Sequence, residues 1–130
     1  MIGMIYLKAT IMQHYEPQSA WGSATRYLEI SEDLYASRQV DIYENGNALR
    51  YDRANWMDEF DSIAGAKYDH DRWVKAWGPD EKITATEFEA AWRLAESAPN
   101  QPQAYRNEAG PWPMLLAEQK RLSRKGGPDK

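Results

Sequence analysis

The sequence predicts an α+β domain in which an antiparallel sheet of three or four strands is covered by a helix. Residues 39–52 alternate apolar and polar side chains around Asn45-Gly46, the dipeptide typical of a tight β-hairpin turn. A second segment has Thr84 in position to cap a helix and Glu87 three residues later, which together form a capping box. A chain of 130 residues with 42% hydrophobic content is expected to form a single domain.

The earlier strands are expected before this hairpin. Residues 1–12 form a strongly apolar run of about half the length that spans a bilayer. Within residues 1–23, this run predicts a buried or edge strand, or a leader from an upstream start codon. Residues 24–30 alternate as a strand does. The strand at 24–30, the hairpin and the capped helix together make residues 24–98 the expected core of the domain.

The hairpin is expected to use Asn45-Gly46 as a two-residue loop. In this register Ile42 faces Leu49, and Asp41 faces Arg50. Apolar side chains then oppose each other, and a carboxylate opposes a guanidinium, so several cross-strand pairs favour the same register.

Three helices are predicted after the hairpin. The capping box starts one at Ala85–Ser97, and apolar residues at helical spacing indicate a shorter one near 56–64. Residues 67–82 have no clean period and are predicted to be a loop. Prolines make the start of 99–130 a linker, and a last helix is expected near 113–123 before a basic tail.

Composition excludes several classes of function. The chain has no cysteine, which excludes disulfides, thiolate zinc sites and cysteine nucleophiles. A net charge of -4 offers no basic field for a phosphate backbone, so we do not expect nucleic acid as a partner. No membrane is expected either, because the apolar run at residues 1–12 is too short to span a bilayer. No Gly-x-Ser-x-Gly frame or glycine-rich phosphate loop occurs, and no cofactor is predicted. The lack of cysteine and of an export signal favours a cytoplasmic location.

Three segments together resemble a family of small, uncharacterised bacterial domains of unknown function. They are the strand YLEI at 27–30, the hairpin RQVDIYENG at 38–46 and the helix start ITATEFEAAW at 83–92. The positions that match the pattern of that family are Arg38, Val40, Asp41, Ile42, Tyr43, Asn45, Gly46, Ile83, Thr84, Glu87, Phe88, Glu89 and Trp92. The resemblance implies a shared fold over roughly residues 25–96, and it implies no activity, cofactor or partner.

The segment between the hairpin and the last predicted core helix carries the candidate function. From Asp52 to Asp71 acidic residues outnumber basic ones, and aromatic residues are interleaved with them. Such a composition suits a basic protein partner, because aromatic anchors dominate binding energy and opposite charge guides association. We expect a protein-binding module more than an enzyme, for example an immunity or inhibitor protein acting on a toxin or a defence enzyme. The predicted contact residues are Trp56, Asp58, Asp61, Tyr68, Asp69, Asp71, Trp73 and Trp77.

Two alternatives stay open. The cluster Asp69-His70-Asp71 would suit a metal-dependent hydrolase or nuclease, because carboxylates bind divalent cations and orient histidine bases. Its spacing is not specific, and a solvated loop is the plainer interpretation. Alternatively, Trp73, Trp77 and Trp92 would line a small-molecule pocket, although tryptophan in a small domain is more often part of the core.

Overall fold

The computed structural model describes residues 4–12, 14, 16–58 and 60–96, and within them the chain forms one antiparallel sheet with helices on both faces. The strand order is β4-β3-β2-β1-β5. The elements are β1 (Ile5–Ile11), the 3-10 helix η1 (Gln18–Trp21), β2 (Ala24–Ile30), β3 (Ala36–Tyr43), β4 (Ala48–Asp52), α1 (His70–Trp77), β5 (Asp80–Lys82) and α2 (Ala85–Glu96). The predicted α+β class is confirmed, with a sheet of five strands.

The strand expected near the N-terminus is β1, which lies inside the sheet between β2 and β5. Its alternate residues Leu7 and Ile11 belong to the core on one face, while Tyr6 packs on the other. The predicted linker and helix within 99–130 lie outside the described residues.

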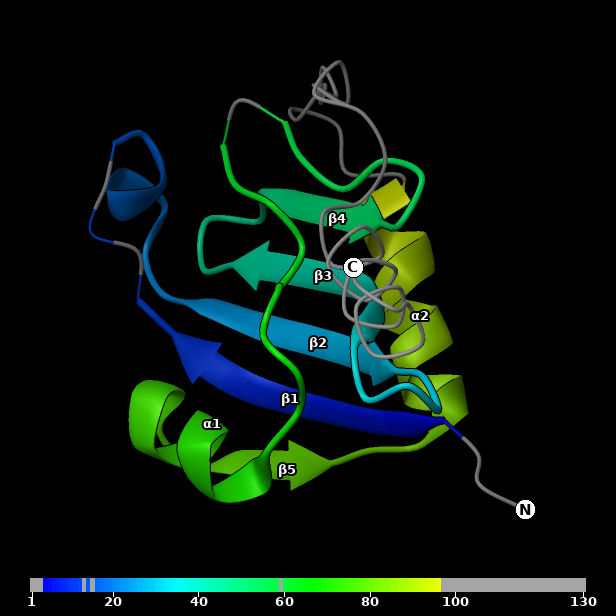
Figure 1. The fold of residues 1–130 in the computed structure, drawn as a ribbon. Coiled ribbons are helices and arrows are strands. Elements are labelled where there is room, and N and C mark those ends of the chain that lie inside the picture. Colours follow the sequence, from blue (N-terminus) through cyan, green and yellow to red (C-terminus); the bar gives the residue numbers. More distant parts are fainter. Residues whose placement is uncertain (1–3, 13, 15, 59, 97–130) are drawn as a thin grey trace, which may run out of the picture.

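The helix α2 begins where the capping box predicts. The hydroxyl oxygen of Thr84 accepts a hydrogen bond from the amide of Glu87 at 3.1 Å. The Glu87 carboxylate accepts a bond from Nζ of Lys8 at 2.9 Å, which ties the first turn to β1. Ile83 and Phe88 both pack into the core between α2 and the sheet, as the hydrophobic staple requires. Figure 1 shows α2 behind the sheet, on the face opposite α1.

The front face of the sheet is covered by an extended stretch of chain, residues 53–58 and 60–69, and by α1. Figure 1 shows this stretch running across the strands from β4 towards the β5 edge. We call it the crossing segment. Trp56 and Ile63 of this segment, together with Trp73 of α1, belong to the buried cluster on this face. The sheet therefore has a core on each side, and a helix covers only part of the front one.

The predicted helix near 56–64 is wrong. Within the described residues of the crossing segment there is no helix, and Met57 and Ser62 form an isolated antiparallel bridge. The carboxylate of Asp58 accepts hydrogen bonds from the amides two and three residues later, at 2.8 and 3.0 Å. Because such local bonds offer the backbone an alternative to helical pairing, they favour a turn here.

The predicted loop over residues 67–82 is also wrong, because it contains α1 and β5. The Asp69 carboxylate caps α1 by accepting a hydrogen bond from the amide three residues later, at 3.1 Å. Gly78 ends the helix with a φ of 90°, and its amide donates to the carbonyl four residues earlier at 2.7 Å. Trp73 and Trp77 lie one turn apart and both pack towards the front core. Asp69, Trp73, Trp77 and Gly78 together are the sequence signal of a short helix. The prediction missed this signal because apolar residues show no helical period over the longer segment 67–82.

The β3–β4 hairpin has a different register from the predicted one. Asp41 pairs with Leu49 instead of Arg50, so the loop holds residues 44–46. Its last residue is a glycine with a φ of 94°, as is typical of a three-residue hairpin loop that ends in the left-handed region. On its other side Asp41 pairs with Arg26 of β2, which supplies the charge match that Arg50 was expected to supply.

Gly22 allows the tip of this hairpin to pack against the chain before β2. Its φ of 91° favours glycine, and a Cβ there would lie 2.8 Å from the Cβ of Glu44. Gly22→Ala should therefore lower the free energy of unfolding by roughly 1–3 kcal/mol in urea titrations. Gly78→Ala is the matched control, because its φ of 90° is similar but no atom lies within 4 Å of the added carbon. An equal loss in the two variants would argue against the contact with Glu44.

Candidate functional site

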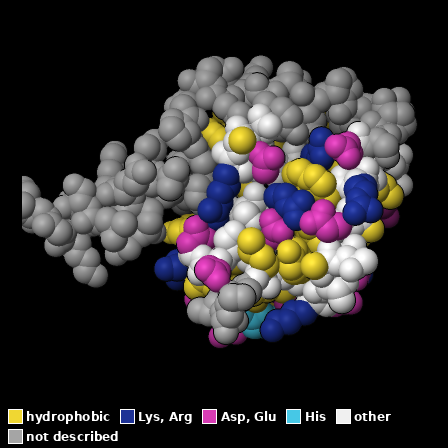
Figure 2. All heavy atoms as spheres, turned by 90° about the vertical axis from the view of Figure 1, so that its right-hand side faces the viewer, with side chains coloured by type: hydrophobic (Ala, Val, Ile, Leu, Met, Phe, Trp, Pro, Cys, Tyr) yellow, Lys and Arg dark blue, Asp and Glu magenta, His cyan; other side chains and the backbone are white. Residues whose placement is uncertain are grey.

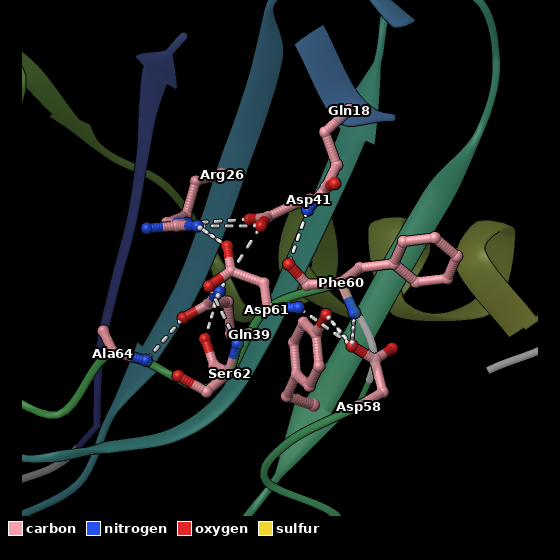
Figure 3. Close-up of polar contacts among 10 residues, drawn as sticks. Gln18, Arg26, Gln39, Asp41, Asp58, Phe60, Asp61, Ser62 and Ala64 are labelled. Atoms are coloured by element: carbon pink, nitrogen blue, oxygen red, sulfur yellow. Dashed lines mark hydrogen bonds and ion pairs between the residues drawn. The ribbon is translucent and has the colours of Figure 1, made fainter. Parts of the chain in front are cut away.

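Buried polar side chains connect the sheet to the crossing segment. Arg26 and Asp41 form a two-bonded ion pair, with Nε to Oδ1 at 2.8 Å and Nη2 to Oδ2 at 2.9 Å (Figure 3). They are 8% and 0% exposed. Burial alone would lower the pKa of Arg26, but the charge and hydrogen bonds of Asp41 together with the charge of Asp61 outweigh burial and raise that pKa, so the guanidinium is charged. Nη2 also lies 3.3 Å from Oδ2 of Asp61, in the crossing segment.

Two glutamine side chains attach the crossing segment to the rest of the fold. Oε1 of Gln39, on β3, accepts a hydrogen bond from the amide of Ala64 at 2.8 Å, and its Nε2 donates to the carbonyl of Ser62 at 3.4 Å. Nε2 of Gln18, on η1, donates to the carbonyl of Phe60 at 2.6 Å. Hydrogen bonds between glutamine side chains and the backbone thus attach this segment to the fold, as backbone pairing attaches the strands to one another (Figure 3).

A tyrosine and an aspartate close the network at β4. The hydroxyl of Tyr51 donates to Oδ1 of Asp58 at 2.8 Å, and both residues are buried. Burial and the neighbouring Asp58 charge raise the pKa of Tyr51 far above its ordinary value, so the phenol keeps its proton and remains a donor.

A hollow of about 350 Å³ lies at the end of β1, next to this network. It is lined by Thr10, Ile11, Met12, His14, Arg26, Ala76 and Trp77, and we call it the Arg26 hollow. Cζ of Arg26 lies 5.3 Å from the centroid of the Trp77 ring, within the range of a cation–π contact. Met12 is 64% exposed at the rim. The hollow therefore combines one charged donor and the polar residues Thr10 and His14 with aromatic and apolar side chains.

The face that carries α2 has a different character. Figure 2, which views the side of the molecule where α2 lies, shows positive and negative side chains interleaved around hydrophobic ones. Arg38 donates to the carboxylates of Glu29, at 2.7 Å, and Glu89, and its Cζ lies 5.1 Å from the Trp92 ring centroid. Burial favours a raised pKa for Glu29, but hydrogen bonds from Arg38, Ser37 and other neighbours outweigh it and lower that pKa. The contact between Arg38 and Glu89 links α2 to β3.

The structure divides the predicted contact residues by burial. Those buried are Trp56, Asp58 and Trp73, those partly buried are Asp61, Tyr68 and Trp77, and those exposed are Asp69 and Asp71. Three of the carboxylates bind within the fold, since Asp58 binds Tyr51, Asp61 binds Arg26 and Asp69 caps α1. Trp77 is the member that lines the Arg26 hollow. Contact with a partner stays a prediction for this set.

The structure bears differently on the two alternative sites, the metal site at Asp69-His70-Asp71 and the pocket between three tryptophans. Among the described residues, no group of three histidine, aspartate or glutamate side chains could hold a metal ion. Nδ1 of His70 lies 3.6 Å from Oδ1 of Asp80, so the histidine of that cluster faces β5. The pocket predicted between three tryptophans is wrong, because Trp73 and Trp77 pack on the front face of the sheet and Trp92 packs on the α2 face.

Most residues that line the Arg26 hollow were not predicted. Met12 and His14 follow an apolar strand, and nothing local marks them as a rim. Arg26 had a usable signal: it occupies an inward position between Ala24 and Leu28 of its strand, where an unpaired charge is not tolerated. An arginine at such a position indicates a buried carboxylate opposite it.

Comparison with protein-family models, with curated proteins and with solved structures finds no match for this chain. The resemblance to small bacterial domains therefore stays a prediction. Within the described residues, no helix is long and apolar enough to cross a membrane. The Arg26 hollow and the network behind it are the features from which a function can be inferred.

Proposed function

We propose that this chain is a protein-binding module that contacts its partner through the Arg26 hollow and the outer side of α1. The observation that carries the proposal is the joint presence of Trp77, Met12 and an 8%-exposed Arg26 around one hollow. Tryptophan and arginine are enriched among the residues that dominate binding energy, and methionine adapts to irregular surfaces. The exposed carboxylates of Asp69 and Asp71, at the other end of α1, would meet a basic group of the partner.

The sequence favours an immunity or inhibitor protein as the form of this role, acting on a toxin or a defence enzyme. An inhibitor of this kind needs a rigid scaffold behind its contact residues, because ordering flexible side chains on binding lowers affinity. The bidentate pair between Arg26 and Asp41 supports such a role, since it fixes the base of the hollow. A cytoplasmic location belongs to the same proposal.

Affinity capture with matched variants tests the proposal. Ala76 lines the hollow from α1, whereas Ala90 is an exposed alanine on α2. Ala76→Glu and Ala90→Glu add the same charged side chain to exposed helical positions, where stability should change by less than about 0.5 kcal/mol. The immobilised full chain should enrich one protein from a lysate of the source organism, Ala90→Glu should retain it, and Ala76→Glu should lose it.

Two outcomes would contradict the proposal. A protein retained equally by both variants would bind somewhere other than the Arg26 hollow. No protein enriched by the unmodified chain, with folding confirmed by circular dichroism, would argue against a protein partner in that lysate.

A further inference from the structure

We infer that the Arg26 hollow accepts a neutral hydrogen-bond acceptor, namely the backbone carbonyl of a peptide segment whose apolar side chain lies against Trp77 and Met12. This inference rests on the proposed function and adds to it the chemistry of the group that enters the hollow. It follows from the free donor on Arg26, from the charge around that donor and from the walls of the hollow.

The donor is Nη1 of Arg26. Nε and Nη2 are occupied by Asp41 and Asp61, whereas Nη1 takes part in no hydrogen bond or ion pair with the described part of the chain. Figure 3 shows a guanidinium nitrogen of Arg26 on the side away from both carboxylates. Arg26 lines the hollow together with Thr10 and His14, and Nη1 is the charged donor that we assign to a ligand there. The bidentate bonds to Asp41 hold the guanidinium plane in place before anything binds.

The charge around the donor disfavours an anion. One guanidinium is bonded to two carboxylates, those of Asp41 and Asp61, so the cluster carries an excess of negative charge. A carboxylate or phosphate at Nη1 would be attracted by Arg26 and repelled by both aspartates, and it would also lose its hydration. A carbonyl oxygen accepts the same hydrogen bond without a net charge, so it avoids the repulsion and most of the desolvation cost.

The walls of the hollow fit an apolar side chain next to that carbonyl. Ile11, Met12, Ala76 and Trp77 supply the apolar part of the lining, beside the polar residues Thr10, His14 and Arg26. The volume of about 350 Å³ lies at the lower end of the range for small-ligand sites. A peptide places a carbonyl and an aliphatic side chain on adjacent bonds. A segment containing leucine or methionine therefore matches both features of the hollow.

Titration of the full chain with small probes tests this inference at pH 7. The probe is N-acetyl-L-leucinamide, which has peptide carbonyls, an apolar side chain and no charge. N-acetyl-L-leucine is the matched charged probe, because its carboxylate is ionised at this pH. The resonances to follow are the indole N–H of Trp77 and the side-chain N–H groups of Arg26. The amide probe should shift both, with a dissociation constant about tenfold below that of the charged probe.

The alanine variants supply the control, since Ala76→Glu should abolish the shifts and Ala90→Glu should preserve them. Tighter binding of N-acetyl-L-leucine would overturn the preference for a neutral acceptor and would leave the proposed function standing. Absence of shifts at Trp77 and Arg26 up to the solubility limit of the amide probe, or shifts confined to other residues, would overturn the inference. Capture from the lysate judges the proposed function separately, because a partner lost with Ala76→Glu can still bind through a different group.

Discussion

Asp41→Asn should lower the free energy of unfolding by about 3–5 kcal/mol, because it leaves the charge of Arg26 buried without its main partner. Asparagine keeps the volume of the side chain, so the loss reports charge and hydrogen bonding more than packing. Asp61 compensates only in part, since it lies 3.3 Å from Nη2 and its side chain is 29% exposed. For a protein at the lower end of the typical total stability of about 5–15 kcal/mol, this loss is large enough to unfold a substantial fraction of the molecules. Urea unfolding followed by tryptophan fluorescence measures it.

A double variant and a surface variant make this measurement decisive. Arg26→Met combined with Asp41→Leu removes both charges and should recover much of the lost stability, because apolar replacements of a buried pair are often neutral or stabilising. Asp33→Asn removes a carboxylate that binds Arg53 at 3.0 Å but is 47% exposed, so its cost should stay below about 1 kcal/mol. Similar losses for Asp41→Asn and Asp33→Asn would mean that the Arg26 pair is not desolvated.

The parts of the fold that local sequence predicts are those that local chemistry determines. The start of α2 is set by two side chains within five residues, Thr84 as the cap and Phe88 in the staple, so it could be read without knowledge of the sheet. The strand at Ala24–Ile30 was likewise visible in its alternation. Both elements carry their own signal in a short window.

The errors occur where distant residues decide. The hairpin register places Leu49 of β4 opposite Asp41, while the charged partner of Asp41 is Arg26 on its other side, in β2. The crossing segment has helical spacing of apolar residues, but Asp58 binds its own backbone and the Tyr51 hydroxyl instead. Gln39 completes the effect by bonding the segment to β3. Tertiary hydrogen bonds thus override a local period.

In the candidate site, too, some expectations from the sequence agree with the structure and others fail because distant residues decide. Aromatic residues of the segment after the hairpin were predicted as contacts, and of these Trp77 lines the Arg26 hollow. The acidic residues were expected on a docking surface, yet Asp58 and Asp61 satisfy donors inside the fold. Sequence composition reports which side chains are present, whereas burial determines which of them are left for a partner.

Phe88→Ala should cost about 3–5 kcal/mol of unfolding free energy, the range for removing a fully buried aromatic ring. Phe88 is 0% exposed, and its ring centroid lies 5.5 Å from that of Tyr6 on β1 and 6.3 Å from that of Trp92 on α2. Cζ of Arg38 lies 4.9 Å from the centroid of the same ring, so the substitution also removes the contact between this ring and the Arg38 guanidinium. The ring is therefore the central contact between α2 and the sheet.

Phe88→Leu is the graded control, because it keeps an apolar side chain and should cost less than about 1.5 kcal/mol. Urea unfolding gives the two losses, and hydrogen exchange of the α2 amides tests their origin. In Phe88→Ala these amides should exchange faster than those of β2 and β3, since the helix loses its anchor while the inner strands keep theirs. Equal losses in the two variants, or uniform acceleration of exchange across sheet and helix, would show that α2 is held mainly by the charged contacts of Arg38 and Lys8 with its glutamates.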